Sequence, residues 1–129
     1  MSSDGKYQTA AVVNGYIYRS IDYGVTWKSA MSDATRSWYS VAMSSDGKYQ
    51  TAVAGGGYIY YSTDYGVTWY PSMSDTTRNW NSVAMSSDGK YQTAVIYGGY
   101  IYYSFNYGVT WNQAQSDATR NWLSVAINK

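Results

Sequence analysis

A motif of one acid, one base and one aromatic residue occurs three times and is the best candidate for chemistry in this chain. An arginine beside an aromatic ring can grip a carboxylate, a phosphate or a sugar. In a second interpretation, the Asp pairs locally with the Arg three residues later and the Trp is a core residue. Because folding of each copy requires such identical residues, we favour local pairing and keep ligand binding as the alternative. The motif comprises Asp33, Arg36 and Trp38, then Asp75, Arg78 and Trp80, then Asp117, Arg120 and Trp122.

Other catalytic chemistry has little support in the composition. The chain contains no Cys, no His and no Glu, which excludes a disulfide framework, a zinc cluster and a histidine base. Its eight acids are all Asp, and each has a counterpart at the same turn position of another repeat. Acid–base catalysis needs titratable groups in unlike environments, which near-identical repeats hardly provide. We therefore predict no enzyme activity, no cofactor and no metal site.

The composition as a whole is that of a β-rich, packed domain. A length of 129 residues corresponds to about one domain. Leu, Ile, Val and Phe are scarce, while 17 Tyr and 6 Trp raise the aromatic share to 19%, which favours strands. The net charge of +1 gives no electrostatic case for nucleic acid or an anionic membrane as a partner. Since neither a signal peptide nor a membrane-spanning apolar run is visible, we expect a soluble chain, cytoplasmic or recombinant.

The chain consists of three copies of one 42-residue unit. Residues 1–42, 43–84 and 85–126 form the repeats of a single domain, 1–129. The first two repeats match at 30 of 42 positions and the last two at 32 of 42, which implies recent duplication or deliberate construction. This length fits one four-stranded propeller blade, and no helical periodicity is visible.

Alternation and turn residues predict four strands in each unit. In the central part of the chain the first is Trp80–Met85, and the Asp-Gly pair within residues 86–90 predicts a tight hairpin after it. The strand at Tyr49–Ala54 is expected to end at the glycines 55–57. The third and fourth strands are predicted at Tyr58–Ser62 and Val67–Tyr70. We label these four strand types A, B, C and D in this order.

The turn between strands C and D has the pattern S-x-D-x-G-x-T-W, with Asn for Asp in the third copy. This pattern resembles the Asp-box repeat of sialidases, sortilin-like receptors and other β-propellers. Each residue has a turn role: the Asx side chain accepts backbone N–H groups, Gly adopts a positive φ, and Trp packs the turn onto the sheet. We therefore interpret the boxes as structural. Their residues are Ser20, Asp22, Gly24, Thr26 and Trp27; Ser62, Asp64, Gly66, Thr68 and Trp69; and Ser104, Asn106, Gly108, Thr110 and Trp111.

The resemblance also bears on where a ligand would bind. In sialidase-type propellers the ligand sites lie opposite the Asp-boxes, which implies the rim that carries the glycine-rich loops and the Asp-x-x-Arg-x-Trp segments. A sialidase needs a nucleophilic Tyr assisted by a Glu, and this chain has no Glu. The alternative function is therefore lectin-like binding of a carbohydrate or small anion, with the ligand-binding residues predicted to be Arg36, Arg78, Arg120, Trp38, Trp80 and Trp122.

Three blades do not close a ring, since propellers usually have about 4–8 of them. The first and third repeats are as aromatic as the second, so no repeat is a polar cap. The sequence starts with a B strand and ends with an extra A strand, 122–127. We therefore predict an all-β, four-stranded-blade propeller whose ring is completed by oligomerisation, with segment 122–127 completing the first blade of a partner chain. The clasp residues are predicted to be Tyr7, Trp122, Leu123, Val125 and Ile127.

Two chains would form six blades and three would form nine, and the usual range favours the homodimer over the homotrimer. Self-assembly is therefore the main predicted property of the chain. Two explanations for such a chain stay open: a binding protein assembled from short chains, or a designed or excised fragment that tests ring closure.

Overall fold

The computed structural model describes residues 1–114 and 118–127, which form antiparallel β-strands without a helix in these ranges. Since they contain no helix, they also contain none long and apolar enough to cross a membrane. The strands are β1 (Gln8–Ala11), β2 (Val13–Gly15), β3 (Ile17–Ser20), β4 (Lys28–Ala30), β5 (Arg36–Met43), β6 (Gln50–Gly57), β7 (Ile59–Ser62), β8 (Tyr70–Ser72), β9 (Arg78–Met85), β10 (Gln92–Gly99), β11 (Ile101–Ser104), β12 (Asn112–Ala114) and β13 (Arg120–Asn121).

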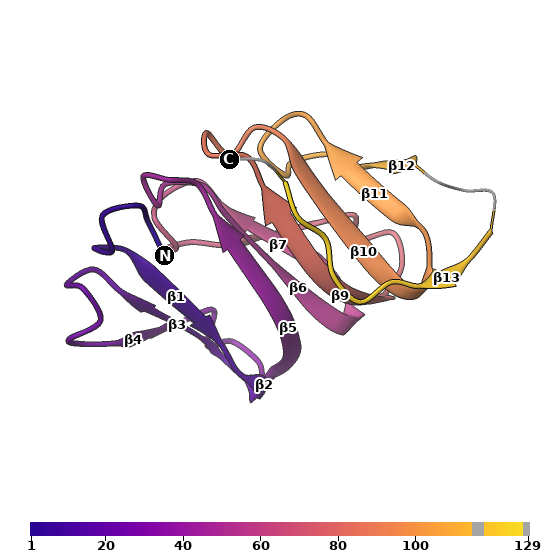
Figure 1. Cartoon of the computed structure of the whole chain (residues 1–129). Coiled ribbons are helices and arrows are strands. Elements are labelled where there is room, and N and C mark those ends of the chain that lie inside the picture. Colours follow the sequence, from indigo (N-terminus) through magenta and orange to yellow (C-terminus); the bar gives the residue numbers. More distant parts are fainter. Residues whose placement is uncertain (115–117, 128–129) are drawn as a thin grey trace.

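The strands group into three sheet units that follow one another along the chain. Strands β5, β6, β7 and β8 pair in this order as the second unit, and β9, β10, β11 and β12 form the third in the same way. The first unit has three strands, in the order β1, β3, β4. Figure 1 shows the three units side by side in chain order. The predicted all-β class with antiparallel sheets is therefore confirmed.

Two predicted strand limits are wrong. The strand that was expected to stop before the glycines 55–57 continues through them, because Gly56 adopts φ +71° and forms a bulge that carries the chain onward. The fourth strand lies at Tyr70–Ser72 and not at Val67–Tyr70. Its start is delayed because Thr68 is held in the preceding turn by Asp64.

The bulged ends connect neighbouring units. At its bulged end, β6 leaves its own unit and pairs with β9, with Gly55 opposite Asn79 and Gly57 opposite Arg78. The same crossing joins β2 to β5 and β10 to β13. The glycine-rich segments are therefore the backbone bridge between successive units.

The hydrophobic core lies between the units rather than within one of them. One cluster joins the first and second units through Ile17, Trp38 and Trp69. A second cluster joins the second and third units through Ile59, Trp80 and Trp111. Because a small sheet has no buried interior of its own, each unit depends on its neighbour for burial of its aromatic side chains.

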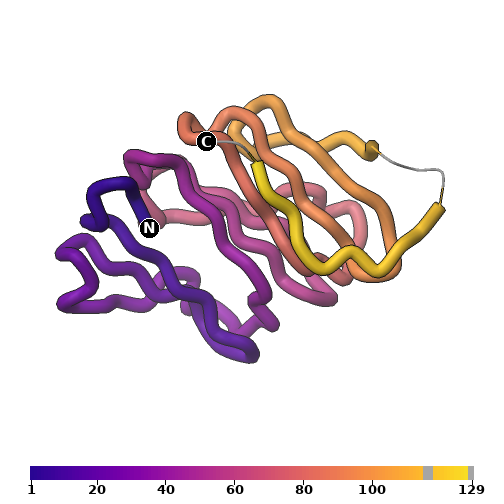
Figure 2. The backbone as a smooth tube through the Cα atoms, in the orientation of Figure 1, coloured from indigo at the N-terminus to yellow at the C-terminus, as the bar shows by residue number. Residues whose placement is uncertain are grey.

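Segment 122–127, predicted to be a strand, has no strand conformation in the chain. It lies at the opposite end of the arc from β1, the B strand that lacks an A strand (Figure 2). Only its preceding residues, β13, pair with β10. The predicted pairing of this segment with a partner chain stays a prediction.

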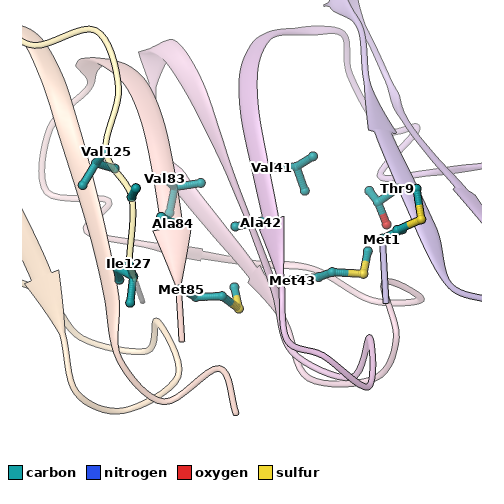
Figure 3. Close-up of a pocket in the computed structure, with 11 residues that line it drawn as sticks. Met1, Thr9, Val41, Ala42, Met43, Val83, Ala84, Met85, Val125 and Ile127 are labelled. Carbon is teal, nitrogen blue, oxygen red and sulfur yellow. The ribbon is translucent and has the colours of Figure 1, made fainter. Parts of the chain in front are cut away.

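A hollow of about 320 Å³ lies along β1, β5 and β9, which are the inner strands of the arc. Figure 3 shows side chains from successive inner strands beside one another: Thr9 on β1, Val41 and Met43 on β5, and Val83 and Met85 on β9. The C-terminal Val125 and Ile127 line the same hollow. The inner strands of the units thus face a common concave surface.

The dependence of each unit on its neighbour predicts a large effect of Trp80→Ala. This side chain has no exposed surface and lies in the cluster between the second and third units. Its removal should lower the free energy of unfolding by about 3–5 kcal/mol. Tyr70→Ala is the control, because Tyr70 is exposed on β8, and should cost less than about 1 kcal/mol. Equal losses in urea unfolding would contradict a core placed between the units.

Candidate functional site

The first two Asp-box turns have the same hydrogen bonds, and the third differs from them in one bond. In the first, the Ser20 hydroxyl donates to Asp22 at 2.8 Å and accepts the Gly24 N–H at 2.9 Å. The Asp22 carboxylate also accepts the backbone N–H of Thr26 at 2.9 Å and its hydroxyl. Trp27 closes the turn by donating its indole N–H to the Gly24 carbonyl at 3.0 Å. The structural interpretation of these residues is therefore consistent with every contact they make.

The third turn retains this arrangement with Asn106 in place of Asp. Its amide oxygen accepts the Thr110 N–H at 3.0 Å, and its amide nitrogen donates to the Thr110 hydroxyl at 2.8 Å. The direction of the second bond is reversed relative to the Asp-boxes, because an amide supplies a donor where a carboxylate has only acceptors. The turn thus tolerates the loss of charge.

Hydrogen bonds keep the Asp-box carboxylates ionised. The pKa of Asp22 falls to about 2, first because of its bonds from the side chain and backbone of Thr26 and then because of Ser20. Burial by itself would raise the pKa of Asp64, but the bonds from Thr68 and Ser62 outweigh it and the pKa is lowered. A lowered pKa means that the charged form stabilises the fold.

The arginines predicted to bind a ligand are engaged by the acid of their own motif. The Arg36 guanidinium donates to both Asp33 carboxylate oxygens at 3.1 and 3.0 Å, and its Nε donates to the Tyr60 hydroxyl at 3.0 Å. Arg78 has the corresponding bidentate pair with Asp75 at 3.0 and 3.1 Å. These contacts give both arginines a local structural role, and ligand binding by them stays a prediction.

The third motif is only partly within the described residues. Arg120 donates to the Ala118 carbonyl at 3.3 Å, while Asp117 lies outside the described ranges. The Arg120 guanidinium also lies over the Trp122 ring, 5.9 Å from its centroid. Trp122 in turn donates its indole N–H to the Gly99 carbonyl at 3.1 Å.

The tryptophans of the first two motifs, predicted to be ligand-binding residues, lie in the core. Trp38 and Trp80 are 1% and 0% exposed and pack edge-on against Tyr60 and Tyr102. A sugar ring cannot stack on a buried indole. Trp122 differs, since it is half-buried at the open end of the arc.

The predicted clasp residues do not meet within the chain. The ring of Tyr7 stacks on Tyr65 of the second unit at 4.7 Å between centroids. Leu123 is exposed at the other end of the arc, where its carbonyl accepts the Asn81 side-chain amide at 3.0 Å. Their predicted contact across two chains stays a prediction.

The described aspartates all act as hydrogen-bond acceptors. Each has a lowered pKa, through a hydroxyl, a backbone N–H or an arginine, so none is a neutral acid at pH 7. The described residues contain no group of three or more Asp side chains that could hold a metal ion. Their common chemistry is the acceptance of hydrogen bonds in turns.

A polar ladder between the units was missed by the sequence analysis. The Thr9 hydroxyl donates to the side-chain oxygen of Gln50, and the Thr51 hydroxyl donates to Gln92, both at 2.6 Å. Gln50, Gln92 and Thr51 are almost completely buried. The available signal was the identical Gln-Thr pair in all three repeats, but its partners are 41 residues away and only the packing of units brings them together.

A groove beside the glycine-rich segment 55–57 was also missed. It has a volume of about 440 Å³, and its lining includes Tyr39, Gly55, Asn79, Asn81 and Tyr97. Both tyrosine rings are exposed. Tyr39 and Asn81 occupy equivalent positions in successive repeats, so this groove falls where the copies differ in sequence.

Comparison with known proteins places this fold among the β-propellers. The chain is similar to YCF48 bound to D1 peptide (TM-score 0.73, 18% identity, 92% of this chain and 39% of that one). It is also similar to YCF48 from Cyanidioschyzon merolae (TM-score 0.67, 19% identity, 88% and 35%). A third similar structure is the GH74 enzyme of Niastella koreensis (TM-score 0.67, 22% identity, 88% and 17%). This chain therefore spans less than two fifths of the length of each.

The family model of the BNR/Asp-box repeat matches residues 60–71 and 102–113. The chain thus carries BNR/Asp-box repeats on a propeller-like β-fold, as the sequence predicted. No curated protein matches the chain in sequence. The first turn, at Ser20–Trp27, lies outside the matched residues but makes the same hydrogen bonds.

The lowered pKa of Asp22 predicts a specific acid dependence of stability. Its contribution is complete above the ordinary pKa of 3.8 and is lost as the pH falls towards about 2. Asp22→Asn should therefore be less stable than the wild type at pH 7, and the difference should shrink between about pH 4 and pH 2. Asn106→Asp is the reverse control and should gain acid dependence. Parallel pH profiles of the urea midpoint for all three proteins would contradict this assignment.

Proposed function

We propose that this chain is a non-catalytic structural module that joins copies of itself head to tail into a closed propeller ring. The observation that carries the proposal is the difference in burial between equivalent tryptophans. Trp69 and Trp111 are 9% and 8% exposed because the preceding unit covers them, whereas Trp27 of the first unit is 41% exposed. The first unit therefore presents the same face as the other two units, but no preceding unit of the chain covers it.

The remainder of that face supports the same reading. Ala10 and Val12 of the first unit are exposed, whereas the equivalent Ala52 and Ala54 are buried in the second. At the other end of the arc, Ile101 is only half-buried, while the equivalent Ile17 and Ile59 are completely covered by the next unit. The two open faces correspond to the two halves of the contact between successive units, which supports a second copy as their partner.

The backbone gives independent support. Strand β1 pairs with β3 alone among the described strands, whereas β6 and β10 each have an inner A strand on the equivalent edge. Segment 122–127 has the Trp-x-Ser-Val-Ala sequence of those A strands. Placing it on β1 of a second copy would satisfy the ladder groups of both.

The number of copies follows from the usual size of the ring. Propellers close with about 4–8 blades. Two chains would provide six blades, and this homodimer is the state we propose over a nine-bladed homotrimer. In both, the contacts are heterologous and close by rotation.

The ring predicts a solution mass of two chains of 14.4 kDa at micromolar concentration. Light scattering after size exclusion measures it directly. A mass of three chains would retain the head-to-tail contact but replace six blades by nine. A mass of one chain at all concentrations would contradict the proposal, and hydrolysis of a glycoside by the purified chain would contradict its non-catalytic part.

A variant in segment 122–127 tests whether this segment forms the junction between two chains. Val125→Asp would bury a charge at the junction, since the equivalent Val83 is buried between units. The variant should run as a single chain with an unchanged circular dichroism spectrum. Tyr70→Asp, on an exposed outer strand, is the control and should remain assembled.

Carbohydrate binding is a second candidate, favoured by the groove between Tyr39 and Tyr97. Exposed aromatic rings stack on sugars, and Asn79 and Asn81 supply both donors and acceptors for hydroxyl groups. A glycan array should then give a signal that Tyr39→Ala abolishes and Tyr70→Ala preserves. An array without signal for the wild type would remove this candidate.

A further inference from the structure

The polar ladder between units continues in one direction along the arc. Each threonine donates forward to a glutamine of the next unit, Thr9 to Gln50 and Thr51 to Gln92, both at 2.6 Å. Each of these glutamines donates its amide to the carbonyl of its own hairpin glycine, at 2.9 Å. The amide is thus fixed, so its oxygen is turned towards the preceding unit.

Both ends of this ladder are open. Gln8 is held in the same pose, because its amide donates to the Gly5 carbonyl at 3.0 Å. No hydroxyl of a described residue donates to its side-chain oxygen. The Thr93 hydroxyl, at the far end, makes no hydrogen bond within the described residues and is half-buried. The first unit therefore has the acceptor, the Gln8 side-chain oxygen, and the third unit has the donor, the Thr93 hydroxyl, for one further hydrogen bond of this series.

A steric contact repeats with the ladder. A Cβ atom added to Gly47 would lie 2.7 Å from Cβ of Tyr7, and one added to Gly89 would lie 2.7 Å from Cβ of Tyr49. In both cases a tyrosine of the preceding unit therefore packs directly against the hairpin glycine. At Gly5 this place is not filled by a tyrosine: a Cβ atom added there would have only the Met1 sulfur within 4 Å, at 3.9 Å. Tyr91, the corresponding tyrosine of the third unit, is 49% exposed.

Two further contacts have the same direction. Tyr7 stacks on Tyr65 at 4.7 Å and Tyr49 on Tyr107 at 4.3 Å between centroids. The equivalent partner in the first unit, Tyr23, is 64% exposed. The backbone N–H of Ser45 also donates to the Ser87 carbonyl at 2.7 Å, as that of Ser3 does to Ser45.

We propose that Thr93 and Tyr91 of one copy dock on Gln8 and Gly5 of a second copy. The Thr93 hydroxyl donates to the Gln8 side-chain oxygen, and the Tyr91 ring covers Gly5 and stacks on Tyr23. This inference rests on the proposed head-to-tail assembly and adds the residue pairs that fix its register. The occupant is a second copy because each contact continues a series that already occurs twice within the chain.

The experiment compares Thr93→Val with Thr51→Val in the full chain. The first removes the donor of the proposed junction, and the second removes the same donor within the chain. Leaving the Gln8 oxygen buried without a donor should weaken each junction about tenfold. Dissociation on dilution, followed by analytical ultracentrifugation, should shift to higher concentration for Thr93→Val. The thermal midpoint of its dissociated chain should stay unchanged.

The controls separate assembly from folding. Thr51→Val should lower the thermal midpoint of the dissociated chain, because its bond lies within one chain. Thr93→Ser retains the hydroxyl and should restore wild-type dissociation. A merely structural role of Thr93 would instead lower the thermal midpoint of the dissociated chain.

A variant of Gly5 tests the proposed packing of Tyr91 against this residue. Gly5 has φ +79°, a conformation that Asn tolerates. Gly5→Asn should keep the chain folded but abolish assembly, because its Cβ would occupy the place of Tyr91. Gly56→Asn is the matched control: Gly56 has φ +71°, its nearest atom is 4.0 Å away, and the first repeat has Asn14 at this position. It should assemble normally.

The outcomes distinguish this inference from the proposed function. If the wild type assembles and neither Thr93→Val nor Gly5→Asn alters its dissociation, the residue pairs are wrong while self-assembly stands. If Val125→Asp assembles like the wild type but these two variants do not, the docking faces are right and the strand exchange is wrong. A wild type that is a single chain at every concentration overturns both.

Discussion

Burial of aromatic side chains between sheet units is the constraint on which the rest of this structure depends. The chain has few aliphatic residues and many aromatic ones. Its small sheets have no interior in which the aromatic side chains could be buried. Trp38 and Trp80 become buried only because another unit packs over them, and the two core clusters lie at these contacts. The stability of one unit is therefore inseparable from the presence of the next, as in other repeat architectures.

The polar residues serve this same packing. Asp-box and hairpin aspartates accept backbone N–H groups and hydroxyls, so they hold short turns in place without a hydrophobic interior. Asp33 and Asp75 have a comparable role towards their arginines, whose guanidinium groups lie against the tyrosines of the core. The charged side chains therefore fix the geometry of the turns, and equivalent acids lie in similar environments in each repeat.

The register between units is set by polar contacts within an apolar interface. A hydrophobic surface alone tolerates sliding, whereas a buried Gln-Thr hydrogen bond is satisfied at one position only. The tyrosine seated on a hairpin glycine adds a steric condition at the same place. Together they give a structural reason for the identity of these residues in all three repeats.

Much of the fold followed from the residues themselves. The 42-residue period, the Asp-box pattern and the alternation of β-branched and aromatic residues specified an all-β repeat fold, because turn chemistry and strand patterning are local. The predicted strand limits at residues 55–57 and at Val67 were wrong because a bulge at Gly56 carries β6 onward to β9, and because Asp64 holds Thr68 in the turn before β8. The sequence did not show that Trp38 and Trp80, predicted as ligand-binding residues, would be buried, because burial depends on the unit that packs over them.

The Gln-Thr ladder and the open groove at Tyr39 depend on residues about 40 positions apart, and no local pattern relates them. By itself, then, the sequence determined the repeat and its turns, since these depend on neighbours within a few residues. Only the tertiary structure decided which aromatic faces are covered, because coverage is a property of how whole units pack.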